Sequence, residues 1–411
     1  MSDMNKDATR GTAAGGNVID FQSAARRAKR EPGETTLIYD PKPDSVGVEL
    51  SEERDGTAHL TITVPGDRVD DALELAHQAL AHRFGIDPND DEGMASLRAR
   101  LGDVAFDSLV TVYVQQHFFA QAIMRVEIMP FLQPEFLDDD LPHSFVDYRF
   151  RADVLIRPEI ELSSYEPVSV VFPPRHEVTD EDVDGYLDYM ARSLAAMDAA
   201  EHGGDAGAGG AGSDGADADV PPLLIDDAWV RANMPEAGSL EGLRGRVRAM
   251  LEHQAQQEWR GELEMRCARE LAKRLASEPG EPYLQKTVES VEDNRIEEMR
   301  ARGVDPQEAF GGPHFDRASW DRAIRAEAVE TLRRSCALDA LADHLDIDLT
   351  QQDILRAYRE TEPNADAQSI VDVLNAGQMH RLCEVALRMR AGDWLVETAK
   401  PKSAADLHVV K

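Results

Sequence analysis

The sequence predicts an elongated multidomain protein with an α+β N-terminal head domain and an all-α, arm-like C-terminal domain. Two patterns of apolar residues carry this prediction. Residues 57–64 and 146–156 alternate apolar with polar side chains, as strands do, whereas apolar residues after about position 223 recur every three or four positions, as on helix faces. A stretch rich in Gly, Ala and Asp, residues 199–219, separates the two parts.

The elements of the head follow from this alternation and from capping residues. Residues 1–46 are interpreted as a disordered tail that holds a short basic segment. The head then occupies residues 47–172. Its predicted elements are, in order, a strand over 57–64, a helix from Asp67 to Gly85, a helical stretch from Met94 to Met129 with a break near Gly102, and strands over 146–156 and 168–172.

The second half is predicted to be helical, beyond a connecting helix and a linker. Residues 173–198 form the connecting helix, which begins at the capping residue Thr179. Residues 199–222 cannot bury apolar surface and are interpreted as a linker. The helical domain covers 223–400, and 401–411 form a tail. Its helices are a long one with an apolar residue at every fourth position from Leu251 to Leu275, and others over 281–302, 317–344, 351–360 and 366–396.

Length, charge and cysteine content restrict the class of protein. A chain of 411 residues favours two or three domains. Its 44 Lys and Arg against 78 Asp and Glu give a net charge of 44 − 78 = −34, which disfavours broad attraction to nucleic acid. Cys267, Cys336 and Cys383 lie far apart and suit buried free thiols. Without an apolar run of membrane length or an apolar targeting segment, we expect no membrane association and a cytoplasmic location.

A search of the sequence for catalytic, cofactor-binding and metal-binding motifs predicts no such site. The chain has no HExxH, GxSxG, P-loop or Rossmann pattern, and its carboxylates fall on predicted solvent faces. The remaining candidates are apolar residues of the helical part, which could pack internally or line an open cradle for unfolded polypeptides. They are Trp320 and Trp394, and seven residues that we take as candidate contacts: Met250, Trp259, Met265, Phe310, Phe315, Met379 and Met389.

Several short segments, in this order, resemble trigger factor, the bacterial chaperone family that meets nascent chains at the ribosome exit. The segments are Leu60–Pro65 with Val69–Leu73, Pro130–Glu135, Arg157–Leu162, Val178–Asp184, Ser239–Arg244 and Trp394–Lys400. The resemblance implies an ATP-independent chaperone without cofactors that holds unfolded or nascent polypeptides, as a monomer or a homodimer.

Two departures from the family pattern alter what the resemblance implies. The family's basic ribosome-binding loop after the first helix is replaced by an acidic segment containing Asp87, Asp90, Asp91 and Glu92, which we expect to repel phosphate-rich surface. The FKBP-type prolyl isomerase domain is replaced by the 199–222 linker, so no isomerase activity is expected.

The sequence leaves alternatives open for both function and ribosome binding. The chain could be a dedicated interaction or scaffold module derived from trigger factor, and a residual prolyl isomerase is a more distant alternative. One dense basic cluster could serve as a relocated ribosome or RNA contact, or only as part of a solubilising tail. Its cations are Arg26, Arg27, Lys29 and Arg30.

Overall fold

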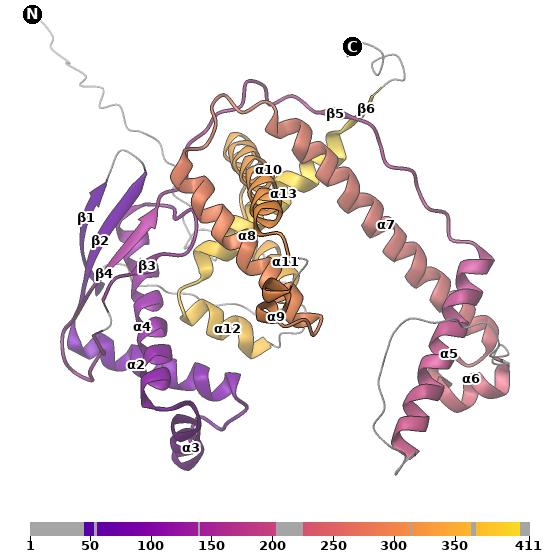
Figure 1. Ribbon diagram of the computed structural model, residues 1–411, viewed down its shortest axis with the longest axis horizontal. Coiled ribbons are helices and arrows are strands. Elements are labelled where there is room, and N and C mark those ends of the chain that lie inside the picture. Colours follow the sequence, from indigo (N-terminus) through magenta and orange to yellow (C-terminus); the bar gives the residue numbers. More distant parts are fainter. Residues whose placement is uncertain are drawn as a thin grey trace, which may run out of the picture. The chain divides into compact units, whose positions relative to one another are not determined.

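A computed structural model describes residues 45–52, 56–138, 140–202, 225–312, 315–362 and 367–402 (Figure 1). The chain divides into two compact units. The first takes in the described residues up to Val168 together with Ala268–Thr398, and the second takes in Ser169–Cys267 and the residues after Thr398. The basic cluster at residues 26–30 and most of the predicted linker lie outside the described residues.

The N-terminal part of the first unit contains a four-stranded antiparallel sheet. Its strands are β1 Gly47–Glu52, β2 Thr57–Val64, β3 Glu135–Phe136 and β4 Tyr148–Leu155, in the order β1-β2-β4-β3. The register pairs Leu60 with Ala152 and Ile62 with Phe150, which places the apolar residues of β2 and β4 on one face. The two predicted strands of the head sheet are confirmed, whereas β1 was not predicted.

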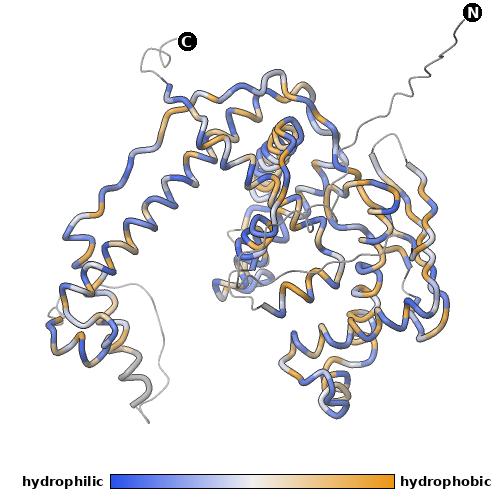
Figure 2. Tube along the Cα trace, turned by 180° about the vertical axis from the view of Figure 1, so that it is seen from behind, coloured by the Kyte–Doolittle hydropathy of each residue, from blue (hydrophilic) through white to orange (hydrophobic). Residues whose placement is uncertain are grey.

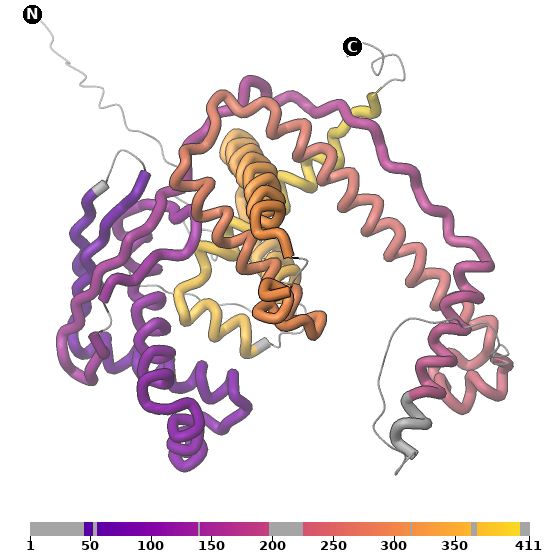
Figure 3. Tube along the Cα trace, in the orientation of Figure 1, coloured from indigo at the N-terminus to yellow at the C-terminus, as the bar shows by residue number. Residues whose placement is uncertain are grey.

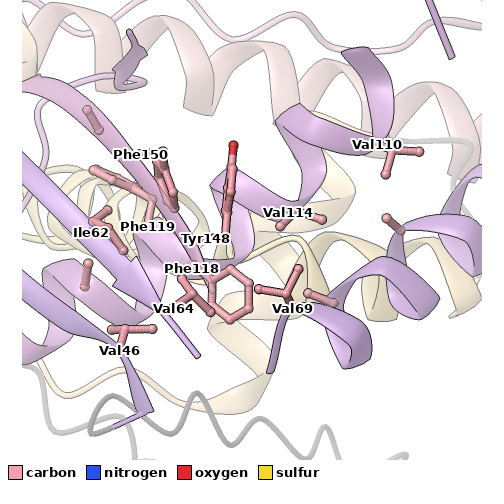
Figure 4. Packing of buried hydrophobic residues seen from close by; sticks show 14 of the residues in the cluster. Val46, Ile62, Val64, Val69, Val110, Val114, Phe118, Phe119, Tyr148 and Phe150 are labelled. Carbon is pink, nitrogen blue, oxygen red and sulfur yellow. The ribbon is translucent and has the colours of Figure 1, made fainter. Parts of the chain in front are cut away.

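Three helices accompany this sheet: α2 Gly66–Arg83, α3 Asp91–Leu101 and α4 Asp103–Val126. They confirm the predicted helices and the break at Gly102, whose φ of 86° suits glycine. Buried side chains of α2 and α4, such as Val69 and Phe118, pack with Ile62 and Phe150 of the sheet in one core (Figure 4). Burial of this apolar surface holds the helices to the sheet.

The rest of the first unit is helical, as predicted. Its helices are α8 Glu281–Ala301, α9 Pro306–Gly311, α10 Arg317–His344, α11 Gln351–Thr361, α12 Ala367–Asn375 and α13 Met379–Thr398. The single helix expected over 366–396 is wrong, because Gly377, with φ of 76°, separates α12 from α13. The short helix α9 was not predicted. Helix α10 packs against both α8 and α13.

Figure 3 shows the C-terminal helices of this unit returning to the N-terminal part, and close contacts between α4 and the α12–α13 turn agree with this. His117 Nδ1 lies 2.5 Å from the carbonyl oxygen of Asn375. On α2, His82 Nδ1 lies 2.7 Å from a carboxylate oxygen of Asp372. A side-chain β-carbon on Gly377 would lie only 2.6 Å from the carbonyl oxygen of Gln116. The turn therefore fits α4 only if glycine stands at position 377.

We predict that Gly377→Ala destabilises the first unit more than Gly303→Ala does. Both glycines have a positive φ, 76° and 75°, but a β-carbon at Gly303 meets no atom within 4 Å. Gly303→Ala should cost about 1 kcal/mol of backbone strain, and Gly377→Ala at least about 2 kcal/mol because α4 must also move. Thermal unfolding followed by circular dichroism measures the difference. Equal shifts would show that the contact with α4 does not constrain the turn.

A buried carboxylate, Asp339 of α10, links three segments of the first unit. The half-buried Arg388 of α13 donates to both of its oxygens, each at 2.8 Å, and to Glu384 at 2.5 Å. Arg157, after β4, lies 4.0 Å from Asp339 and donates to Asp343 at 2.8 Å. Burial opposes the charge of Arg388, but Asp339 and Glu384 raise its pKa, so it stays protonated. Burial, partly offset by Arg388, raises the pKa of Glu384 to about 7.

We predict that Arg388→Met costs about 3 to 5 kcal/mol of unfolding free energy, because Asp339 and Glu384 would stay buried without their cation. Arg390→Met is the matched control. Arg390 is an exposed residue of the same helix, and its Nε lies 3.8 Å from Asp353, so its loss should cost about 0.5 kcal/mol or less. Denaturant unfolding of both variants tests this, and similar losses would contradict it.

The second unit contains a long helix whose N-terminal end packs against two shorter helices. It contains α5 Asp180–His202, α6 Asp227–Asn233, a 3-10 turn at Pro235–Ala237, and most of α7 Leu240–Ala272. Hydrophilic and hydrophobic residues alternate along α7 (Figure 2). Its residues Leu243 and Val247 pack against Val183 and Leu187 of α5 and Val230 of α6.

The predicted strand over 168–172 has a different role from the strands of the head sheet. Only Ser169–Val170 forms a strand, β5, and it pairs in parallel with β6, Lys400–Pro401. Among the described residues, no helix combines the length and apolar character needed to cross a bilayer.

Candidate functional site

Three aromatic side chains gather where α9 leads into α10. The ring centroid of Phe310 lies 4.9 Å from that of Phe315 and 5.3 Å from that of Trp320. The Trp320 indole Nε1 donates to Glu292 of α8 at 3.1 Å, which fixes the ring against the neighbouring helix. All three side chains are half-buried, so each ring keeps part of its apolar surface accessible.

Helix α7 presents two exposed methionines. Met250 is 41% exposed and Met265 is 37% exposed. Fifteen residues of an α-helix correspond to about 60° of rotation and about 22 Å of rise, so both side chains lie on roughly the same side of α7. Flexible thioether side chains at such positions can adapt to apolar groups of different shape.

The other three candidate residues are Trp259, Met379 and Met389, and each of them is half-buried. Trp259 donates its indole N–H to the carbonyl of Pro173 at 2.9 Å, and the guanidinium of Arg175 lies 4.4 Å from the ring centroid. Met379 and Met389 are half-buried and pack against the cluster formed by α11, α12 and α13. The structure therefore brings Phe310 and Phe315 together and places the other five candidates elsewhere.

Sequence reasoning gave less weight to two residues that the structure makes prominent. Trp320 completes the aromatic cluster, and its five-residue spacing from Phe315 was the available signal. Tyr189 on α5 is 68% exposed. It lies outside the buried stripe of Val183 and Leu187, so its position in the helical period could have marked it as exposed.

The acidic segment after α2 lies at the surface. Its carboxylates, Asp87, Asp90, Asp91 and Glu92, are all exposed. Asp87 accepts from the Asn89 backbone N–H at 2.9 Å, and Asp90 caps α3 by accepting from the Gly93 N–H at 3.0 Å. Two of the four carboxylates therefore stabilise the turn and the start of α3.

The buried thiols do not provide a nucleophile at neutral pH. All three cysteines are free and buried, as predicted. Burial raises the pKa of Cys267 to about 11 and the pKa values of Cys336 and Cys383 to about 12, so the thiols stay protonated. In the part of the chain that the structure describes, no group of three or more His, Cys, Asp or Glu side chains could hold a metal ion.

The fold defines a protein with a small α+β domain followed by helices that expose apolar side chains, and comparisons with known proteins specify the family. The family model "Bacterial trigger factor protein (TF)" matches residues 47–190, and the model "Bacterial trigger factor protein (TF) C-terminus" matches residues 239–397. The chain therefore belongs to the trigger factor family, and its general role is that of a chaperone.

Curated relatives agree with this membership. Trigger factor of Bifidobacterium longum (strain NCC 2705) is 24% identical over 372 residues, covering 76% of this chain and 81% of the relative. Trigger factor of Natranaerobius thermophilus is 31% identical over 148 residues, covering 35% of this chain and 32% of the relative. Trigger factor of Photobacterium profundum is 35% identical over 148 residues, covering 34% of this chain and 33% of the relative.

A solved structure described as "Promiscuous Substrate Recognition in Folding and Assembly Activities of the Trigger Factor Chaperone" is also similar, with a TM-score of 0.33 and 14% identity, covering 85% of this chain and 99% of that chain. Between the two matched family models lie residues 191–238, which is 239 − 191 = 48 residues.

Proposed function

We propose that this protein is an ATP-independent holding chaperone that binds apolar segments of unfolded or nascent polypeptides. The observation that carries the proposal is the pair of exposed methionines, Met250 and Met265, on α7 of a domain that matches the trigger factor C-terminal model. The aromatic cluster of Phe310, Phe315 and Trp320 supports it with a second, more rigid apolar surface.

The mechanism follows from binding alone. A protein that binds non-native chains lowers the concentration of free unfolded chain without a catalytic residue. Methionine side chains accept apolar groups of many shapes at little strain, which suits a binder of unrelated sequences. The net charge of −34 favours the solubility of complexes that still expose apolar client segments.

We propose that the chain lacks prolyl isomerase activity. The 48 residues between the two family matches are fewer than the roughly one hundred of a typical small domain. Acceleration of a proline-limited refolding reaction by substoichiometric amounts of this protein would overturn this part of the proposal.

We predict that the double substitution Met250→Ser, Met265→Ser weakens suppression of client aggregation. Loss of two adaptable apolar contacts should raise the protein concentration needed for half-maximal suppression roughly three- to tenfold. Light scattering of several unrelated unfolded clients measures this. Val112→Ser is the matched control, because Val112 is 43% exposed but lies on α4 of the head, and it should change the value less than about twofold.

The range of clients separates this proposal from a dedicated partner module. A holding chaperone should protect unrelated clients at near-stoichiometric ratios, whereas protection of a single client would favour a scaffold module for one partner. A double variant with wild-type protection of every client would show that α7 is not the binding surface.

We further propose that the acidic segment after α2 does not bind the ribosome. Four exposed carboxylates, Asp87, Asp90, Asp91 and Glu92, should repel ribosomal phosphates. Co-sedimentation with ribosomes across a salt series should therefore not weaken when Asp91→Asn is combined with Glu92→Gln, whereas a loss of binding would show that the segment is a ribosome contact. If binding occurs and depends steeply on salt, the cations at Arg26, Arg27, Lys29 and Arg30 are its candidate source, and neutralising them should abolish it.

A further inference from the structure

A loop of the head domain exposes an apolar patch. Residues 140–147, here called the Phe145 loop, precede β4. Phe145 is 74% exposed, Val146 53% and Leu141 43%. Phe145 and Val146 are neighbours in the chain. Two neighbouring apolar side chains this exposed favour contact with a partner, because isolated exposed apolar residues are ordinary but contiguous ones are not.

The loop is held in one conformation at both of its ends. The Tyr148 hydroxyl donates to the Asp140 carbonyl at 2.9 Å, and the Gly66 N–H donates to the Asp147 carboxylate at 2.9 Å. Phe145 has a φ of 58°, which bulky residues rarely adopt. Its backbone lies against Gly66 so closely that a β-carbon there would be 2.5 Å from the Phe145 carbonyl carbon. The contacts with α2 thus fix an exposed phenylalanine in a strained conformation.

Carboxylates surround this patch. Asp140 and Asp147 belong to the loop. Asp67 and Asp71 are exposed on the first two turns of α2, near Asp70, which accepts from Ser144. Arg68, which pairs with Asp71 at 3.1 Å, and the exposed His143 are the basic side chains of these two segments. The surface is therefore complementary to a segment that combines apolar residues with several cations.

The chain contains such a segment before its first strand. Ile19 and Phe21 are followed by the cations Arg26, Arg27, Lys29 and Arg30, all outside the described residues. This is the dense basic cluster of a chain with a net charge of −34. The segment has apolar residues followed by cations, and the surface has an apolar patch with carboxylates beside it, so each part of the segment has a complementary part on the surface.

The sheet register places Gly47, where the chain that follows this segment enters the sheet, at the same end of the sheet as the patch. Gly47 of β1 pairs with Thr63, and Thr63 pairs with Arg149, so β1 begins at the same end of the sheet as β4. Two strand spacings separate Gly47 from Arg149, about 10 Å. Residues 31–44 connect the basic cluster to the sheet. A random coil of 14 residues would span about 20 Å on average and at most about 50 Å, so the connection is long enough to reach the patch.

We propose that residues 18–30 of this chain dock on the Phe145 loop. Ile19 and Phe21 cover Phe145 and Val146, and the basic cluster pairs with the carboxylates of the loop and of α2. The short connection gives the segment an effective concentration of about millimolar, so weak contacts suffice.

Hydrogen exchange tests the docking in the full chain. Backbone amides of residues 140–147 should exchange at least about fivefold more slowly in the full-length protein than in a variant lacking residues 1–35. The same loss of protection is expected for the charge reversals of Arg26, Arg27, Lys29 and Arg30 to Glu. Exchange that is identical in all three proteins would overturn the proposal.

A second measurement uses a labelled peptide of residues 16–32 added to the variant lacking residues 1–35. Phe145→Asn with Val146→Ser should weaken binding at least about tenfold, and asparagine tolerates the positive φ, so the loop stays folded. Val104→Ser is the matched control, since Val104 is 82% exposed on α4, and it should change the affinity less than about twofold.

Three results would reject this docking. Equal affinity of the loop variant for the peptide would place the segment elsewhere. Equal binding of an uncharged apolar peptide would make the patch a client surface. A dimer that disappears on deletion of residues 1–35 would show that the segment docks on a second copy. None of these measurements depends on Met250 or Met265, so the docking and the holding function can fail separately.

Discussion

The carboxylate of Asp339 is buried in the helical part of the first unit, and the arrangement of three segments depends on the cations that neutralise it. Asp339 places α10 against α13, and Glu384 shares the guanidinium from one turn earlier on α13. Arg157, at the exit of the head domain, joins the same group of charges because its guanidinium lies 4.0 Å from Asp339. A buried carboxylate without a cation is strongly unfavourable, so the ion pairs favour the arrangement in which these segments meet.

Local patterns in the sequence predict much of this fold, and tertiary contacts determine the rest. Alternation over 57–64 and 146–156 identifies β2 and β4, because each has one buried face. Strand β1 escapes prediction because it is an edge strand, and its Leu50 is exposed. The separation of α12 from α13 depends on Gly377 lying against α4, a contact between residues more than 250 positions apart, which helical periodicity cannot reveal.

The candidate surfaces are less predictable than the fold. Met250 and Met389 have the same chemistry and both lie on helices, yet one is exposed and the other packs in a cluster. The two methionines differ only in which segments pack against their helices. Phe310, Phe315 and Trp320 come together because the chain turns between α9 and α10. The residue types indicated apolar binding, whereas the partition between core and surface required the structure.

The short pairing of β5 with β6 has a consequence for the order in which the protein forms during its own synthesis. Val170 leaves the head domain early in the chain, yet its strand partner is Pro401. In the first unit, Asp339 is likewise synthesised before Arg388, its ion-pair partner. The sheet with α2 and α4 can collapse as soon as β4 has been translated, since its core lies between residues 46 and 154. Neither complete unit can close before residues 388–401 leave the ribosome. The growing polypeptide therefore carries an open β5 edge for more than half of its translation, and an Asp339 without Arg388 only during its last part.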